Sequence, residues 1–222
     1  MSQNVPECPI LSHAHQNEQT NPIPPYPLAG VAFLAVSRMV PLPMQTRYDQ
    51  ADVRRLLDQW VDHIAAGFSK TEPLIVIGIR TRGETLAQRL TPLLVARGFD
   101  KISRGVLDIT LYRDDLSEIG PRPMVRPTHI EVDINSKPLL LVDDVLFTGR
   151  TVRAALDALA DFGRPSAIRL AALVDRGGRE LPIQADFVGL TQKDVPMSHR
   201  VKVKLMETDG EDQILIEPRN AG

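Results

Sequence analysis

One stretch, Lys137-Pro-Leu-Leu-Leu-Val-Asp-Asp-Val-Leu-Phe-Thr-Gly-Arg-Thr-Val-Arg-Ala-Ala-Leu156, contains a strand, a turn and the start of a helix in immediate succession. Residues 139–142 form a continuous apolar run, which is typical of a strand covered on both faces of a parallel sheet. From Thr151 onward the apolar residues recur at helical spacing, and Gly163 follows as a stop signal. The stretch therefore predicts a strand that leads directly into a helix.

The turn between this strand and helix holds the residues with the clearest chemistry. Asp143 and Asp144 lie at the carboxyl end of the strand, and ionised carboxylates accept hydrogen bonds from sugar hydroxyls. The helix begins with free backbone N–H groups and the positive end of its dipole, which together bind an anion such as phosphate. We therefore predict a ribose 5-phosphate site at this sheet edge. Its phosphate loop comprises Val145, Leu146, Phe147, Thr148, Gly149, Arg150 and Thr151.

An ordinary strand-to-helix turn, with Asp144 or Thr148 capping the helix, is the alternative interpretation. Any single residue fits it, but an adjacent acid pair followed by Thr-Gly-Arg-Thr fits it poorly. The Walker pattern Gly-x-x-x-x-Gly-Lys and the dinucleotide pattern Gly-x-Gly-x-x-Gly are both absent from the sequence. The stretch resembles instead the phosphoribosyl-pyrophosphate motif of type I phosphoribosyltransferases, which phosphoribosyl-pyrophosphate synthetases also carry in a version of their own.

The composition is that of an ordinary globular protein. The 222 residues are 43% hydrophobic and 24% charged, which allows one sizeable domain. The net charge of −2 argues neither for nor against a nucleic-acid partner, because a basic patch can lie within a neutral total. Cys8 is the only cysteine, so an internal disulfide is excluded and a reducing cytoplasm fits.

The first 44 residues differ from the rest. They hold eight of the 18 prolines and no hydrophobic period of useful length, so we predict a disordered extension over 1–44 and one domain over 45–222. The apolar run 28–36 lacks the basic flank of a signal peptide and is too short to cross a membrane. Met39 and Met44 leave open a later natural start.

A second turn of the same kind is predicted upstream. Asp49 is a plausible N-cap for a helix whose apolar face runs from Val53 to Phe68. The buried strand 74–79 then leads through Arg80-Thr81-Arg82-Gly83 into another helix, which ends at Gly98. Guanidinium groups bind pyrophosphate well, so two anion sites at one sheet edge fit a substrate with a phosphate at one end and a pyrophosphate at the other.

The remaining segments complete an α/β pattern. Residues 106–112 alternate as a strand does, and the long loop after them is a lid or a tolerated insertion, two interpretations that the sequence leaves even. Residues 167–174 form another buried strand, and 201–205 with 213–216 form a hairpin across Asp209-Gly210. Strands that alternate with helices predict a largely parallel sheet flanked by helices.

Four blocks together resemble one family, the bacterial pyrimidine-operon regulators that are also uracil phosphoribosyltransferases. The blocks are Ile77-Gly-Ile-Arg-Thr-Arg-Gly83, Asp108-Ile-Thr-Leu-Tyr-Arg-Asp-Asp-Leu116, Leu141-Val-Asp-Asp-Val-Leu-Phe-Thr-Gly-Arg-Thr-Val-Arg153 and Leu173-Val-Asp-Arg-Gly-Gly-Arg-Glu-Leu-Pro182. The resemblance runs from about Tyr48 to Ile216. It implies a type I phosphoribosyltransferase fold with a lid loop and a small hood, a homo-oligomer and no membrane segment.

The resemblance also implies a reaction and a role for each block. Uracil and phosphoribosyl pyrophosphate would give UMP and pyrophosphate, with Mg²⁺ carried on the substrate and no metal ligand from the protein directly. The catalytic pair would be Asp143 and Asp144, which would take the ribose hydroxyls. The other implied site residues are Arg80, Thr81, Arg82, Gly83, Asp175 and Arg176 for pyrophosphate, Tyr112, Arg113, Asp114 and Asp115 for the lid, Phe187 and Val188 for the base, and Arg179 and Lys193 for RNA.

This chain departs from the family on the face that would bind leader mRNA. The family has His and Arg where this chain has Gly178 and Gln184, and Thr and His where it has Asp58 and Asp62. Carboxylates near phosphates weaken binding, so we predict weak leader binding with intact catalysis. Two alternatives stay open: a nucleotide-sensing regulator with little catalysis, and a phosphoribosyltransferase for another base.

Overall fold

The computed structural model of the chain describes residues 45–114 and 126–219. The chain divides into two units, residues 1–40 and 41–222. The first unit lies outside the described residues, as do the predicted disordered extension 1–44 and the lid residue Asp115.

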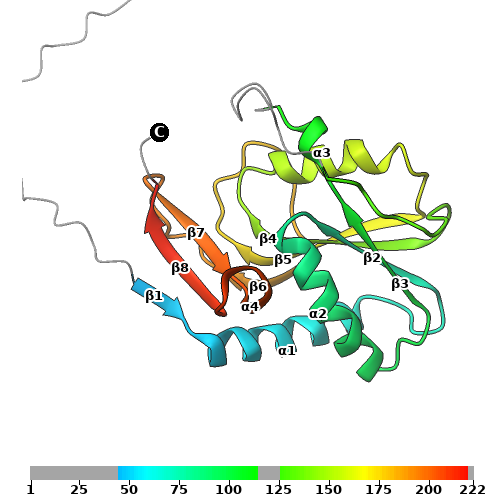
Figure 1. Ribbon diagram of the computed structural model, residues 1–222, viewed down its shortest axis with the longest axis horizontal. Helices are drawn as coiled ribbons and strands as arrows, with labels where there is room; N and C mark the ends of the chain where they lie inside the picture. The colour runs from blue at the N-terminus through cyan, green and yellow to red at the C-terminus, as the bar shows by residue number, and fades with distance from the viewer. Residues whose placement is uncertain (1–44, 115–125, 220–222) are drawn as a thin grey trace, which may run out of the picture. The chain divides into compact units, whose positions relative to one another are not determined.

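A five-stranded parallel sheet forms the centre of the second unit (Figure 1). Its order is β3-β2-β4-β5-β6, and every neighbouring pair is parallel. This confirms the predicted fold class. The bounds are β2 Leu74–Ile79, β3 Ile102–Leu107, β4 Pro138–Leu146, β5 Ala167–Asp175 and β6 Phe187–Thr191.

Helices cover both faces of this sheet, as the figure shows. Helices α1 (Gln50–Ala66) and α2 (Arg82–Ala96) pack on one face, and α3 (Arg150–Leu159) packs on the other. The side chains of β4 alternate accordingly. Leu140 and Val142 belong to the core under α1 and α2, whereas Leu139 and Leu141 face α3. The continuous apolar run of β4 therefore serves two cores at once.

A small antiparallel sheet, which we call the hood, stands beside the carboxyl edge of the large sheet. Its order is β1-β8-β7, with β1 Gln45–Tyr48, β7 His199–Lys204 and β8 Gln213–Pro218. The short helix α4 (Met206–Asp209) connects β7 and β8, so the predicted hairpin is confirmed with a helical turn inside it. Strand β1 was not predicted, because its four residues are too few to show a period.

The first helix begins as predicted. The Asp49 side chain accepts a hydrogen bond from the backbone N–H of Asp52, and the Asp52 side chain accepts one in return, which forms a capping box. One apolar face then lies at helical spacing in the core, with Trp60 fully buried.

The predicted strand 106–112 is wrong beyond Leu107. Strand β3 ends there, and Thr110–Tyr112 form a short 3₁₀ helix, η1. The cause is Asp108, whose side-chain oxygens accept the backbone N–H groups of Thr110 and Arg126, each at 2.7 Å. Such a local bond gives the backbone an alternative to the ladder of the sheet, so the chain turns away.

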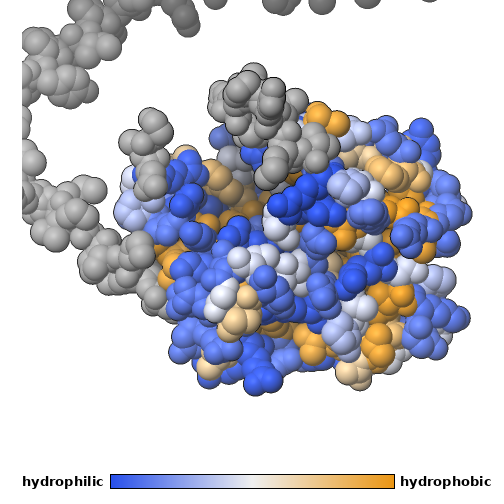
Figure 2. Space-filling model, viewed as in Figure 1, coloured by the Kyte–Doolittle hydropathy of each residue, from blue (hydrophilic) through white to orange (hydrophobic). Residues whose placement is uncertain are grey.

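The visible surface is predominantly hydrophilic, with smaller hydrophobic patches (Figure 2). Large apolar side chains that stand exposed are scattered over several elements, among them Val95, Leu111, Leu156 and Met197. Among the helices of the described residues, none is both long enough and apolar enough to cross a membrane.

Candidate active site

The carboxyl ends of the five parallel strands meet at one edge, and β2 and β4 lie side by side there. The helices that follow these two strands, α2 and α3, pack on opposite faces of the sheet. A crevice at such a switch point is where ligands bind in open α/β sheets. Both predicted anion turns, at 80–83 and 145–151, open onto this point.

The acid pair lies in the last part of β4. Asp143 is only 6% exposed, and one of its side-chain oxygens accepts the backbone N–H of Asp144 at 2.9 Å. Burial, and after it the charge of Asp144, hold the pKa of Asp143 well above its usual value. Burial also raises the pKa of Asp144, while the nearby charge of Arg82 opposes that rise. Hydroxyl groups that donate to the pair favour its ionised form.

The phosphate loop follows directly. Gly149 has φ +94°, a conformation that suits glycine, and α3 begins at Arg150, whose backbone N–H donates to Thr148 Oγ1 at 3.3 Å. The Thr148 carbonyl in turn accepts the backbone N–H groups of Glu180 and Leu181, which ties the loop to the segment after β5. The loop is therefore held open at the positive end of α3.

A cavity of about 630 Å³ lies against this loop. Three guanidinium groups and one carboxylate line it, together with two hydroxyls and an aromatic ring, and a polar cavity of this kind suits an anionic ligand. The lining residues are Arg113, Asp114, Phe147, Thr148, Arg150, Thr151 and Arg219.

The arginines of α3 join the loop to the start of the predicted lid. Arg150 donates to Asp114 and Glu180, each at 2.7 Å. Arg153 also reaches Asp114, at 3.4 Å, and the Tyr112 hydroxyl donates to Asp161. The described lid residues 112–114 are thus fastened to α3. Neutralising Asp114 would free Arg150 only in part, since Glu180 remains.

The pyrophosphate turn lies beside the acid pair. A Cβ at Gly83 would come within 2.4 Å of the Val142 carbonyl oxygen, so only glycine lets the start of α2 approach β4 this closely. The Arg80–Thr81 peptide bond is cis. Arg80 donates to the Pro127 carbonyl at 3.0 Å, and Arg82 forms a two-bond contact with Asp209 of the hood.

Asp175 and Arg176, also predicted to serve pyrophosphate, have internal partners. Asp175 accepts the backbone N–H of Gly177 at 2.8 Å and pairs with Arg179 at 2.8 Å. Arg176 is 4% exposed, donates to the His199 carbonyl at 3.1 Å and lies 3.9 Å from the centre of the Phe147 ring. Burial, and then the charge of Arg219, lower its pKa. Arg176 therefore fastens the hood to the phosphate loop.

The predicted base-contacting ring is not brought to the crevice. Phe187 is 8% exposed, and its ring lies 5.7 Å from that of Phe68, in the core under α1. Its carbonyl accepts the indole N–H of Trp60 at 3.1 Å. Val188, the next residue along β6, points to the other face and is partly buried.

The two candidate RNA contacts differ. The guanidinium of Arg179 donates to the carbonyls of Phe147 at 2.9 Å and Ile183 at 2.8 Å and pairs with Asp175, so it is used inside the loop. Its contact with RNA stays a prediction. Lys193 is exposed.

Asp209 and Glu180 were missed by sequence reasoning, because acids in a hairpin or a loop carry no signal of a partner far away in the chain.

The donors present fit a magnesium ion that arrives on a substrate. In the described part of the chain, no group of three or more His, Cys, Asp or Glu side chains is arranged to hold a metal. Two adjacent carboxylates, Asp143 and Asp144, do stand at the crevice, and Mg²⁺ is commonly bound through one or two carboxylates together with substrate phosphates.

The comparisons with known proteins agree with this geometry. Residues 45–207 match a family model described as the phosphoribosyl transferase domain. A relative from Thermus aquaticus named bifunctional protein PyrR is 54% identical over 165 residues, covering 73% of this chain and 90% of its own. A relative of the same name from Deinococcus radiodurans is 49% identical over 181 residues, covering 80% of this chain and 97% of its own.

Solved structures show the same fold at low identity. A hypoxanthine-guanine phosphoribosyltransferase from Bacillus anthracis aligns with a TM-score of 0.57 at 15% identity, covering 80% of this chain and all of that one. The enzyme from Leishmania tarentolae in complex with GMP aligns with a TM-score of 0.58 at 14% identity, covering 80% of this chain and 97% of that one. At such identities the likeness establishes the fold alone.

Proposed function

The chain belongs to the PyrR family of phosphoribosyltransferases, and we propose that it transfers the phosphoribosyl group of phosphoribosyl pyrophosphate to uracil, giving UMP and pyrophosphate. One observation supports the reaction type above all. An acid pair at the end of β4 lies between an open phosphate loop and an arginine-bearing turn at the same sheet edge. That arrangement matches the sugar, the phosphate and the leaving group of one substrate.

In this proposal each part of the edge has a role. Asp143 and Asp144 accept hydrogen bonds from the ribose hydroxyls and stabilise the positive charge that develops on the sugar as the bond to pyrophosphate breaks. The backbone N–H groups at the start of α3, with Thr148 and Thr151, hold the 5′-phosphate. Arg82 and Gly83 face the leaving group. The lid, which includes Arg113 and the undescribed Asp115, excludes water from the reacting carbon.

Magnesium enters this proposal only as part of the substrate complex. Carried on the pyrophosphate, the ion would supply positive charge that offsets the charge of the leaving group. Asp143 and Asp144 are the residues of this chain that would face it. Because burial raises the pKa of both carboxylates, a cation and hydroxyl donors beside them would favour their ionised form.

The choice of base is the finer part of the proposal. It rests on the family rather than on a side chain, because the Phe187 ring lies in the core. In place of the Phe187 ring, we propose that backbone groups near Val188 or residues of the hood contact the base. Transfer to a different base is the alternative, and the fold is shared with enzymes whose names refer to hypoxanthine and guanine.

The proposal includes a second, regulatory activity of the family, binding to pyrimidine-operon leader mRNA, in weakened form. The relatives are named bifunctional. In this chain Asp62 on α1 pairs at 2.6 Å with Arg97 at the end of α2, so the Arg97 guanidinium already has a carboxylate partner. A homo-oligomer in the cytoplasm, where the phosphorylated substrates are made, completes the proposal.

Product analysis tests the proposed reaction. The purified protein is incubated with labelled phosphoribosyl pyrophosphate, Mg²⁺ and a panel of free bases, and we expect UMP from uracil as the main product. Replacing Asp143 and Asp144 together by Asn should lower turnover by orders of magnitude while the folded state persists in circular dichroism. Turnover near that of the wild type in the double variant would remove the acid pair from the mechanism, and a nucleotide of another base would correct the substrate.

A further inference from the structure

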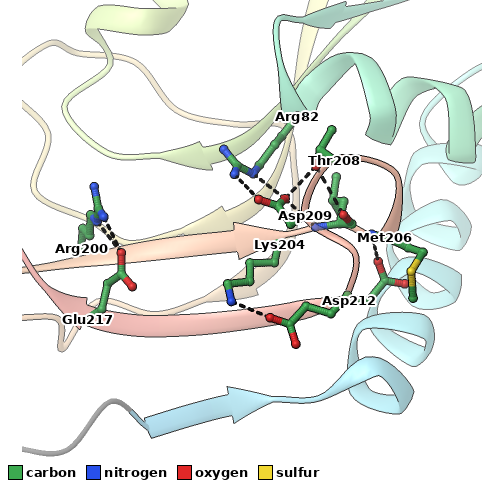
Figure 3. A network of polar contacts seen from close by, with 10 residues as sticks. Arg82, Arg200, Lys204, Met206, Thr208, Asp209, Asp212 and Glu217 are labelled. Carbon is green, nitrogen blue, oxygen red and sulfur yellow. Dashed lines mark hydrogen bonds and ion pairs between the residues drawn. The ribbon is translucent and has the colours of Figure 1, made fainter.

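The hood contacts the pyrophosphate turn through one side chain, Asp209 at the end of α4. Its two carboxylate oxygens accept Arg82 Nη2 at 2.8 Å and Arg82 Nε at 3.3 Å (Figure 3). The two residues are 127 positions apart in the chain, and both side chains are mostly shielded, Arg82 being 30% exposed and Asp209 16%. A two-bond pair of this kind fixes the plane of the guanidinium as well as its position.

Asp209 is itself held firmly in place. The same oxygen that accepts Arg82 Nε also accepts the Thr208 hydroxyl at 2.7 Å (Figure 3). It accepts the backbone N–H of Leu205 as well, at 3.0 Å. Burial would raise the pKa of Asp209, but the hydrogen bonds from Arg82, Thr208 and Leu205 outweigh it and lower the pKa to about 2. The carboxylate is therefore ionised at neutral pH, and two bonds from its own segment hold it in addition to those from Arg82.

The backbone of Arg82 is held in place by the start of α2. Gly83 presses the first turn of α2 against the Val142 carbonyl, next to the acid pair. The charge of Arg82 acts on Asp144, where it counters the rise in pKa that burial causes. Among the described residues, Asp209 is the only hydrogen-bond partner of Arg82, and it uses Nε and Nη2, so Nη1 donates to none of them.

We propose that Asp209 is a positioning residue, which holds the Arg82 guanidinium so that its free edge meets the pyrophosphate of the substrate. This inference rests on the proposed phosphoribosyl transfer but not on the choice of base. In water an arginine side chain loses much conformational freedom when it binds an anion, and a fixed partner removes that cost beforehand. The hood thereby takes part in the chemistry of the leaving group, from a segment outside the predicted motifs.

A matched control lies two helical turns further along α2. Arg89 pairs with Glu207 of the same α4 segment, with Nε to Oε1 at 2.8 Å, and with Asp212, with Nη2 to Oδ1 at 2.7 Å. Residues seven apart share one face of a helix. The Arg89–Glu207 pair therefore fastens the same hairpin to the same helix, seven residues beyond Arg82, and Glu207→Gln removes one carboxylate charge just as Asp209→Asn does.

The test compares the binding of magnesium pyrophosphate and of ribose 5-phosphate by calorimetry in the wild type, Asp209→Asn and Glu207→Gln. We expect Asp209→Asn to weaken pyrophosphate binding about tenfold, as loss of one charge-assisted contact does. Ribose 5-phosphate lacks the leaving group, so its affinity should be unchanged in both variants. Glu207→Gln should bind both ligands as the wild type does.

Other outcomes overturn the inference. Equal losses of pyrophosphate affinity in both variants would mean that the hairpin only needs to be docked. Tighter pyrophosphate binding by Asp209→Asn would make Asp209 a competitor of the ligand, and weakened ribose 5-phosphate binding would reveal a general disturbance of the site. These titrations need no base and no turnover. If the wild type binds both ligands but makes no UMP, the proposed reaction with uracil is contradicted. The comparison of the variants still decides the role of Asp209.

Discussion

The Asp143 carboxyl group is almost fully buried, and its burial lowers the free energy of unfolding when the group is ionised. Burial and the neighbouring Asp144 both raise its pKa, so the folded chain holds the proton more tightly than the unfolded chain does. A carboxyl group with a raised pKa contributes stability at low pH, and that contribution is lost as the pH rises through the folded pKa. The ionised acid pair therefore lowers the free energy of unfolding of the empty enzyme in neutral and alkaline solution.

Replacing Asp143 by Asn should separate the effect of this carboxylate on stability from its effect on turnover. The amide still accepts the backbone N–H of Asp144 but has no charge to desolvate. We expect the melting temperature of the ligand-free variant to exceed that of the wild type at about pH 8, and the difference to shrink towards about pH 5 as the pair takes up its proton. Turnover should fall by orders of magnitude. A variant that melts below the wild type at the higher pH would show that the ionised side chain stabilises the fold.

The elements that the sequence predicts correctly are those whose signals are local. The apolar run of β4, the Thr-Gly-Arg-Thr turn and the period of α3 lie within one stretch, and each specifies its own structure. The end of β3 was missed because Asp108 caps the turn with a residue, Arg126, that lies beyond a long loop. The burial of the Phe187 ring was missed for a related reason, since its neighbours, Trp60 in α1 and Phe68 just after it, lie far away in the chain.

Strand β1 shows what a short element can contribute. It is one of the two edge strands of the hood, pairing Gln45 with Ile216 and Tyr48 with Ile214, and the Tyr48 side chain packs against the main core. A ladder of this kind satisfies backbone groups of β8 that would otherwise face solvent or another chain. The hood therefore depends on residues that lie just past the predicted disordered extension 1–44.

Two truncations test this division of the chain. A protein that begins at Met44 keeps β1, and we expect its activity and melting temperature to equal those of the full chain. A protein that begins at Asp49 loses β1 but keeps the capping box of α1, and we expect a lower melting temperature together with weaker pyrophosphate binding, since β8 follows the Asp209 turn. A clear loss in the longer truncated protein would show instead that residues before 44 support the domain.

On the scale of the whole molecule, the site is assembled from segments far apart in the sequence. Its two turns are predictable because parallel strands bring their carboxyl ends to one edge. The Arg82–Asp209 contact between the pyrophosphate turn and the hood is not, because an ion pair across 127 residues leaves no spacing or period to recognise. The same holds for Arg179, a candidate for RNA by resemblance, which the folded chain uses to fasten the phosphate loop.

Regulation by RNA also depends on the whole surface, and the structure changes how it is best tested. Gly178 has φ +70°, and a Cβ there would lie 2.5 Å from the Phe147 ring. Introducing His at that position would therefore disturb the phosphate loop. Asp58, Asp62 and Gln184 are exposed, so side chains of the kind found in the family fit there without repacking. The informative variant is the triple one, Asp58→Thr, Asp62→His and Gln184→Arg.

We expect the wild type to bind a pyrimidine-operon leader hairpin weakly and the triple variant to bind it more tightly with unchanged turnover. Removing two carboxylates and adding one guanidinium favours contact with phosphates, and His in place of Asp62 also releases Arg97 from its ion pair. Titrations against the cognate hairpin and a scrambled one, each at two salt concentrations, give the affinity, the selectivity and the salt dependence. Asp157→Asn on α3 is the control, because it removes a carboxylate on the other face of the sheet and should change little. Tight, selective and salt-tolerant binding by the wild type would contradict the prediction, since the two carboxylates on α1 would then lie outside the RNA-binding surface.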